Sequence, residues 1–379
     1  MAQSRQHRPY ELQAFMVQSG GIIAAEACVR LISECAVGLG KSPRFHGRRV
    51  NHEAADMSLA LSWIKECAES HHCGKGVVAE RAGVGDGLTL VDVKQDCLVE
   101  APWDSKYIAL SYVWPRVIAD AMNVVLLLGQ RFLWVDALCI VHDDGETAER
   151  LIKAMDQVYG RSFLIIVVAS GSDPSHDYGI SGINGLPRSI RQDSARVDGL
   201  DLVAALANYD KALRSSLWST CGWIFQEGIL SGRCLVFSEQ QMYFRCGHDS
   251  RCEDVRAEGR GRFDKHAAKP IVRGGQLDYL GSDHFLRQVS SKNIWQEYAL
   301  LVSGYTSRNL TFEEDVHNAS KGIMQSLTSL LGPVGFFIGL PIGFFDATLL
   351  WYPTSRLRRR QAQTGDSRMS LLPTWSWMA

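Results

Sequence analysis

The sequence predicts an α/β fold, in which helices cover both faces of a largely parallel sheet. Two observations predict it: short apolar runs rich in β-branched and aromatic residues, and helical segments that separate these runs. The runs occupy residues 107–114, 132–140 and 163–169, and the helices residues 117–130 and 145–160. Strands that alternate with helices are typical of a parallel sheet joined by crossovers. We therefore expect three neighbouring parallel strands, with functional residues at their carboxyl ends.

The segments on either side of this core contain further predicted elements. Apolar residues at helical spacing predict helices at Met57–Ser70 and near 24–37, 291–304 and 312–330. Residues 216–246 divide into a helical first half and a β-hairpin over 233–246. We expect a mostly helical lead-in over 1–100, an α/β core over 101–246, and a helical or mixed extension over 247–379 that packs on the core.

Composition excludes several classes of protein. The 379 residues are 46% hydrophobic and 21% charged, with a formal net charge of −1, which is ordinary for a globular chain. No global field therefore attracts nucleic acid or an anionic membrane, and we expect neither partner. The apolar run over 332–352 is interrupted by prolines, glycines and Asp346, so we expect buried loop and strand there rather than a membrane span.

The ten cysteines are expected to be mostly reduced. Several of them lie inside apolar segments, and the N-terminus has no apolar signal region, so we expect a cytoplasmic protein. Two groups of metal-ligand residues occur, Cys67/His71/His72/Cys73 and Cys246/His248/Cys252. Because neither group has the paired C-x-x-C spacing of a zinc site, we expect no metal.

Asp136 is the most informative single residue, because it interrupts the apolar stretch RFLWVDALCI. A buried carboxylate is normally paired, so we expect Asp136 to be buried and ionised, with Arg233 as its first-choice partner. The pair is either structural or orients a ligand. Cys139 and His142 could form a nucleophile and its base, although a buried structural cysteine is the favoured interpretation.

Several motifs together resemble a known family. YIALSYVW, FLWVDALCI, MDQVYG and GWIFQEGILSGRCLVF are similar, in order and spacing, to the fungal heterokaryon-incompatibility (HET) domain. The WIKECAESHHC segment and the C-terminal TWSW motif extend the resemblance over residues 60–379. The chain departs from the family pattern at Pro115, His142 and Cys221, and its loop after Trp114 is short.

The resemblance implies a flavodoxin/TIR-like fold and a role in fungal self/non-self recognition and programmed cell death. The leading hypothesis is an effector that acts through protein partners or self-association, without a cofactor. The alternative is a TIR-like NAD(P) glycohydrolase with NAD as its substrate. The resemblance then implies catalytic carboxylates at Glu227 and Asp136 and further ligand-binding residues at Tyr112, Trp114, Cys139, Asp143, Trp223, Gln226 and Arg233.

The two hypotheses differ in one structural expectation. An open pocket lined by Asp136, Trp223 and Glu227 favours the enzyme, in which Trp223 or Trp114 would stack on the nicotinamide. Residues that are sealed in packing favour assembly. Glu227 also has a plain alternative role, a salt bridge with Arg233.

Overall fold

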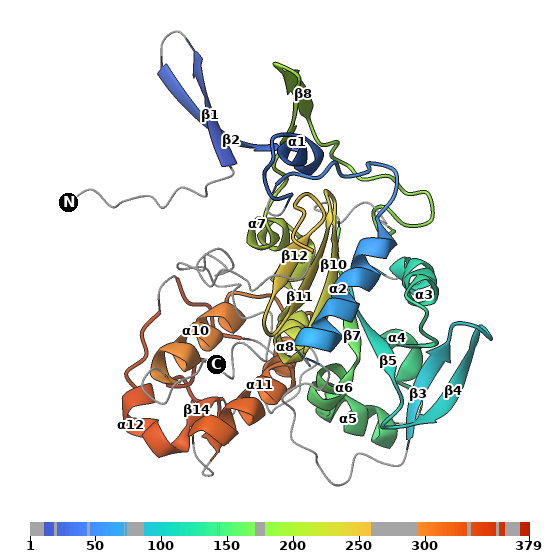
Figure 1. Cartoon of the computed structure of the whole chain (residues 1–379). Coiled ribbons are helices and arrows are strands. Elements are labelled where there is room, and N and C mark those ends of the chain that lie inside the picture. Colours follow the sequence, from blue (N-terminus) through green and yellow to red (C-terminus); the bar gives the residue numbers. More distant parts are fainter. Residues whose placement is uncertain are drawn as a thin grey trace.

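A mixed eight-stranded sheet forms the centre of the molecule (Figure 1). The computed structural model describes residues 11–18, 21–43, 46–71, 73, 87–114, 116–141, 143, 145–170, 179–258, 294–331, 335–353, 356–360 and 372–379. The strand order is β12-β11-β10-β7-β5-β6-β3-β4. These strands are β3 (Gly87–Asp92), β4 (Cys97–Pro102), β5 (Tyr107–Ser111), β6 (Phe132–Trp134), β7 (Leu164–Ala169), β10 (Arg233–Ser238), β11 (Met242–Cys246) and β12 (Ser250–Cys252).

The four middle strands, β10, β7, β5 and β6, are parallel. β5 pairs with β6 on one side and with β7 on the other, so the prediction of three parallel strands is confirmed. All residues of β5, β7 and β10 are buried, as expected of strands covered on both faces. The predicted hairpin is confirmed as β10 and β11, in which Arg233 pairs with Cys246. Antiparallel strands at both edges make the sheet mixed.

Helices cover the sheet. α2 (Met57–Ser70) packs on β11 and crosses in front of the sheet in Figure 1, and α3 (Val117–Leu127) packs on β5 and β6. α8 (Gly222–Leu230) packs on β5, and α6 (Met155–Arg161) packs on α8. The predicted bounds of α2 are confirmed. The helix begins after Asp56, whose side chain accepts hydrogen bonds from the backbone N–H groups of Ser58 and Leu59.

A second apolar cluster joins the C-terminal region to the outer side of α8. α10 (Ile294–Thr306) and α11 (Val316–Leu331) surround Phe225 and Ile229 of α8 together with Trp377. Gly322 allows α11 to approach closely, since a Cβ atom there would lie 2.5 Å from Cβ of Asp156 in α6. The predicted C-terminal helices are thus confirmed, with a short 3₁₀ turn, η2 (Glu313–Asp315), before α11.

The lead-in is less helical than expected. Residues 24–37, predicted to be a helix, lie mostly in β2 (Gly21–Leu31), followed by the short α1 (Ser33–Gly38). β2 pairs with β1 (Glu11–Gln18) and β9 (Leu200–Ala204), and β9 pairs with β8 (Ser194–Val197). β9 lies about 170 residues away in the chain, so its pairing with β2 is a tertiary contact. The apolar periodicity of residues 24–37 carries no information on this contact. β3 and β4, also in the lead-in, belong to the central sheet.

Three segments consist of shorter elements than the sequence predicts. The helix predicted over 145–160 is divided at Ala154 into α5 (Gly145–Lys153) and α6. The chain before α8 forms α7 (Tyr209–Arg214) and a 3₁₀ turn, η1 (Leu217–Thr220). Within 332–352 the described residues form β13 (Phe336–Phe337), β14 (Leu340–Pro341), η3 (Ile342–Phe344) and α12 (Phe345–Thr348). Among the described residues, no helix is both long and apolar enough to cross a membrane.

Candidate functional site

Glu227 lies in the middle of α8, on the side of the helix that faces the sheet. Its side chain reaches the carboxyl end of β5, where the Ser111 hydroxyl donates to its Oε2 atom at 2.6 Å. The Trp218 indole N–H in turn donates to Oγ of Ser111 at 2.9 Å. The Tyr159 hydroxyl, from α6, lies near this carboxyl and donates to the backbone carbonyl oxygen of Leu110 at 3.2 Å. We call Glu227, Ser111, Trp218 and Tyr159 the Glu227 centre.

Burial sets the protonation of this centre. Glu227 is only 5% exposed, and removal from water raises its pKa to about 8. The nearby charge of Asp136 raises this pKa further, while the hydrogen bond from Ser111 and the nearby Tyr159 hydroxyl partly offset the rise. Burial also raises the pKa of Tyr159 well above its usual value. At neutral pH Glu227 therefore holds its proton, and it could act chemically as an acid.

Asp136 occupies a different position from the one predicted. It begins α4 (Asp136–Cys139), directly after β6, and its side chain is half-buried rather than sealed in a strand. The Tyr112 hydroxyl donates to its Oδ1 atom at 2.9 Å. The predicted partner Arg233 instead donates to Sγ of Cys67 at 3.3 Å. The pairing with Arg233 was wrong because β6 ends at Trp134, so Asp136 lies at the carboxyl edge and Arg233 at the amino edge of the sheet.

The predicted salt bridge between Glu227 and Arg233 was wrong for the same geometric reason. Arg233 starts β10 and stacks over the Phe163 ring, with 5.0 Å from its guanidinium carbon to the ring centroid. Arg131, five residues before Asp136, pairs with another carboxylate, because its Nε atom donates to Oδ2 of Asp92 at 2.8 Å.

The other predicted ligand-binding residues lie in different surroundings. Trp223 packs against the second apolar cluster, on the outer side of α8. Gln226 is buried where Gly322 of α11 approaches α8, and neither polar atom of its amide has a hydrogen-bond partner among the described residues. Within the same described part of the chain, the indole N–H of the half-buried Trp114 also lacks a hydrogen-bond acceptor. Asp143 is exposed on the surface.

Cys139 is a structural thiol. It is buried in α4, and the backbone N–H of Val135 donates to its sulfur at 3.4 Å. Burial raises the pKa of Cys139 to about 12, so it is not an ionised nucleophile at neutral pH. Its suggested base His142, like His72, Pro115 and Asp144, lies outside the described residues.

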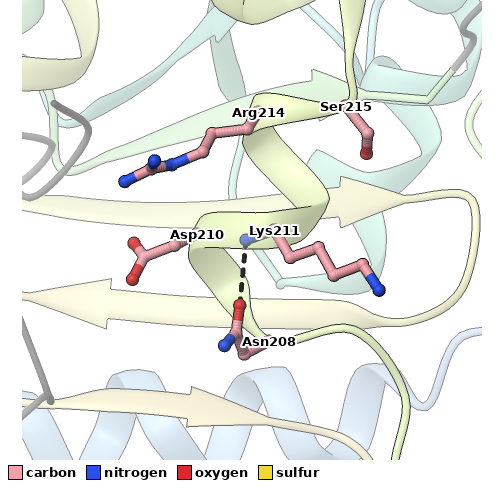
Figure 2. Close-up of a pocket in the computed structure, with 5 residues that line it drawn as sticks. All are labelled: Asn208, Asp210, Lys211, Arg214 and Ser215. Carbon is pink, nitrogen blue, oxygen red and sulfur yellow. Dashed lines mark hydrogen bonds between the residues drawn. The ribbon is translucent and has the colours of Figure 1, made fainter. Parts of the chain in front are cut away.

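A surface hollow lies elsewhere, on α7 (Figure 2). It is lined by Asn208, Asp210, Lys211, Arg214 and Ser215. Asn208 caps the helix by accepting from the backbone N–H of Lys211 at 2.9 Å. The charged ends of Lys211 and Arg214 point in opposite directions, so they do not converge on one ligand. None of the predicted site residues lines this hollow.

The two groups of cysteine and histidine residues that the spacing argument rejected come together in space. Candidate ligand atoms of Cys67, His71, Cys73 and Cys246 all lie within 4.8 Å of one another. The sequence argument treated the two groups separately, about 175 residues apart, and so missed this arrangement. We call these four residues the thiol–imidazole cluster.

Three residues of the Glu227 centre were also missed by the sequence argument. Ser111, Tyr159 and Trp218 lie within or beside motifs that pointed to other residues. A signal was present for Ser111, because a serine that ends a fully apolar strand needs a hydrogen-bond partner when buried. Tyr159 was assigned only to an apolar helix face.

Comparison with known proteins identifies part of the chain. Residues 108–227 match the family model described as Heterokaryon incompatibility protein (HET). The match begins in β5 and ends at Glu227, so it includes the whole Glu227 centre and Asp136. The comparison with curated proteins found no match, and neither did the comparison with solved structures. Residues 108–227 are therefore similar to the HET domain, and this similarity indicates a function related to heterokaryon incompatibility.

Proposed function

We propose that this chain is a HET-domain effector of fungal self/non-self recognition, which triggers programmed cell death through protein assembly. One observation carries the choice of assembly over catalysis. Among the described residues, Glu227 and Trp223 do not line a common pocket: Glu227 is sealed against the sheet, and Trp223 faces the second apolar cluster on the other side of α8. An active site needs convergent groups that a substrate can reach.

An exposed apolar surface near the C-terminus supports assembly. Leu350 is 79% exposed and Tyr352 is 80% exposed, and Phe337 and Trp375 are also partly open to solvent. The Phe337 ring lies 6.0 Å from that of Trp375 and 6.4 Å from that of Phe345, measured between centroids. We call these five residues the C-terminal apolar surface. Aromatic residues gathered at a surface in this way mark protein interaction sites.

The test measures self-association and cell death together. The double variant Leu350→Glu/Tyr352→Glu places two charges on the C-terminal apolar surface, and Leu127→Glu serves as control on an exposed apolar position of α3. We expect assemblies of the wild type and the control in analytical ultracentrifugation, and monomers of the double variant. Expression in a fungal host should cause death except with the double variant. A monomeric wild type that still kills would contradict the proposal.

A second candidate function is a TIR-like NAD(P) glycohydrolase, and two observations favour it. Glu227 keeps a proton near neutral pH, as an acid catalyst must. The parallel strands have the order β6-β5-β7-β10, which is the 2-1-3-4 order of flavodoxin-like sheets. In such sheets a ligand binds at the β5/β7 switch point, close to Ser111.

NAD hydrolysis separates the two candidates. Purified protein is incubated with NAD, and nicotinamide release is measured for the wild type, Glu227→Gln and the control Glu146→Gln on the exposed start of α5. We expect no release from any of them. If the wild type and Glu146→Gln release nicotinamide and Glu227→Gln does not, the proposed function becomes catalysis rather than assembly.

Two further expectations accompany this proposal. We retain the division of the chain into 1–100, 101–246 and 247–379, although β3 and β4 extend the central sheet into the first of these parts. A cytoplasmic location fits ten cysteines that form no disulfide in the described structure. Limited proteolysis and fluorescence microscopy of a tagged chain test these two expectations.

A further inference from the structure

The thiol–imidazole cluster is built where α2 meets the end of β11. Cys67 and His71 lie four residues apart near the end of α2, so they occupy one face of the helix. Cys246 is the last residue of β11, on the same face of that strand as Phe244. The ring of Trp63, one helical turn before Cys67, lies 6.5 Å from that of Phe244. This apolar contact brings the thiols of the two elements together.

The distances in the cluster suit a tetrahedral metal site. The four candidate ligand atoms lie within 4.8 Å of one another, and Sγ of Cys246 is 3.4 Å from Nδ1 of His71. Zn–S bonds of about 2.3 Å and Zn–N bonds of about 2.0 Å give tetrahedron edges of roughly 3.5–3.8 Å. The side chains therefore need only small rotations to surround one ion.

Charge provides an independent argument. Arg233 is only 4% exposed, and its Nε atom donates to Sγ of Cys67 at 3.3 Å. Its other polar contact among the described residues is the carbonyl of Phe163, at 3.5 Å, and no carboxylate pairs with it there. A buried guanidinium needs a counter-charge. Three thiolates and one Zn²⁺ carry a net charge of −1, which balances this cation.

We propose that Cys67, His71, Cys73 and Cys246 bind one Zn²⁺ ion as a structural site. Three soft thiolates and one imidazole favour zinc over magnesium or calcium. Binding displaces three thiol protons to solvent, and the neutral imidazole contributes a lone pair. Four protein ligands close the coordination sphere, and the three cysteines are buried, so no position is left for a substrate.

His248 supports the site from outside the ligand set. Its ring stacks on that of His71, with 5.2 Å between centroids, and its Nδ1 atom lies 3.1 Å from Sγ of Cys73. In the tautomer with its proton on Nδ1, His248 donates to the Cys73 thiolate, and such a donor orients a ligating sulfur. The ion then fastens the lead-in helix α2 to the hairpin that follows the HET domain, two segments about 175 residues apart in the chain.

Metal content of the purified full chain tests the proposal. The protein is prepared without metal-affinity steps and analysed by inductively coupled plasma mass spectrometry. We expect about one zinc per chain in the wild type, as for a closed four-ligand site, and a loss of most of it in Cys67→Ser and Cys246→Ser. The control Cys234→Ser changes another buried cysteine of the same sheet and should keep the zinc. An absence of zinc, or iron in its place, overturns the proposal.

A second measurement uses only wild-type protein, in case the variants do not fold. A mercurial reagent is titrated into the protein, and released zinc is followed with a metallochromic dye. We expect zinc to leave as the three cluster thiols react, and Co²⁺ substitution to give the absorption of tetrahedral thiolate-bound cobalt. Peptide mapping that finds a disulfide among Cys67, Cys73 and Cys246 in the freshly purified chain would overturn the proposal.

Discussion

The Glu227 centre and the thiol–imidazole cluster are two buried polar groups at opposite strand ends of the same sheet. Glu227 meets Ser111 at the carboxyl end of β5, whereas Cys246 pairs with Arg233 at the amino end of β10. The Glu227 centre lies within the HET match, and the cluster lies entirely outside it. Both join segments far apart in the chain, so each affects the stability of the whole core.

The two groups compensate for burial in different ways. Glu227 avoids a buried charge by keeping its proton and by accepting a hydrogen bond from Ser111. The cluster places cysteines beside the buried cation Arg233, which calls for an anionic partner. The comparison shows two ways in which one fold buries ionisable groups. Glu227 is buried as a neutral acid, and the cluster thiols are buried, in our proposal, as thiolates bound to a metal ion. Four predictions can break or sharpen this comparison.

The largest effect is expected at the thiol–imidazole cluster. Removing the ion with a strong chelator, or one ligand by Cys246→Ser, leaves the remaining thiols and Arg233 without their compensation. We expect a loss of about 5 kcal/mol or more, which for a chain of 379 residues corresponds to a fall in Tm of about 6 °C or more. Differential scanning calorimetry measures it. A Tm unchanged by the chelator would mean that the cluster is stable without a metal.

The second effect is a pH dependence at the Glu227 centre. Its pKa is raised from 4.5 to about 8 in the folded protein, so the folded state binds this proton more tightly than the unfolded state does. The resulting stabilisation is complete below pH 4.5 and is lost as pH rises toward 8.

Glu227→Gln should remove this dependence, because the amide has no proton to lose. Relative to the wild type, we expect the variant to gain at most about 5 kcal/mol at pH 9 and little at pH 5. Urea unfolding at the two pH values provides the measurement. Parallel pH profiles of the two proteins would mean that Glu227 is already ionised in the fold.

The third effect concerns the serine that links Trp218 to Glu227. Ser111→Ala removes one donor to the carboxyl and the acceptor of the Trp218 indole N–H. We expect a loss of about 2–3 kcal/mol, because two buried polar groups lose a partner. Thermal unfolding compared with Ser219→Ala, a part-buried serine of η1, checks it. Equal Tm shifts in both variants would contradict a special role of Ser111.

The smallest effect is expected at Asp136. The half-buried carboxylate accepts one hydrogen bond from Tyr112 and one from the backbone N–H of Ala137. Asp136→Ala should cost less than about 1.5 kcal/mol, far below the cost of breaking a buried ion pair. Urea unfolding tests this value. A loss of about 4 kcal/mol would restore the sequence-based expectation of a sealed and paired Asp136.

Local patterns predicted much of the core correctly. The parallel strands β5, β6 and β7, the hairpin of β10 and β11, and helix α2 follow from periodicity and turn residues within each segment. Asp136 was singled out because a carboxylate in an apolar stretch needs compensation, whereas Glu227 was singled out by the family resemblance. Residues 24–37 were misassigned because their β2 conformation depends on pairing with β1 and with the distant β9.

The sequence by itself determined which segments form strands and helices in the core, because apolar periodicity and turn residues act over a few positions. Only the tertiary structure decided which polar residues meet. Arg233 faces Cys67 rather than Asp136, because β6 ends before Asp136 and places it at the other edge of the sheet. Cys246 reaches Cys67 because α2 packs on β11. Such meetings depend on the packing of segments more than a hundred residues apart, which no local spacing encodes.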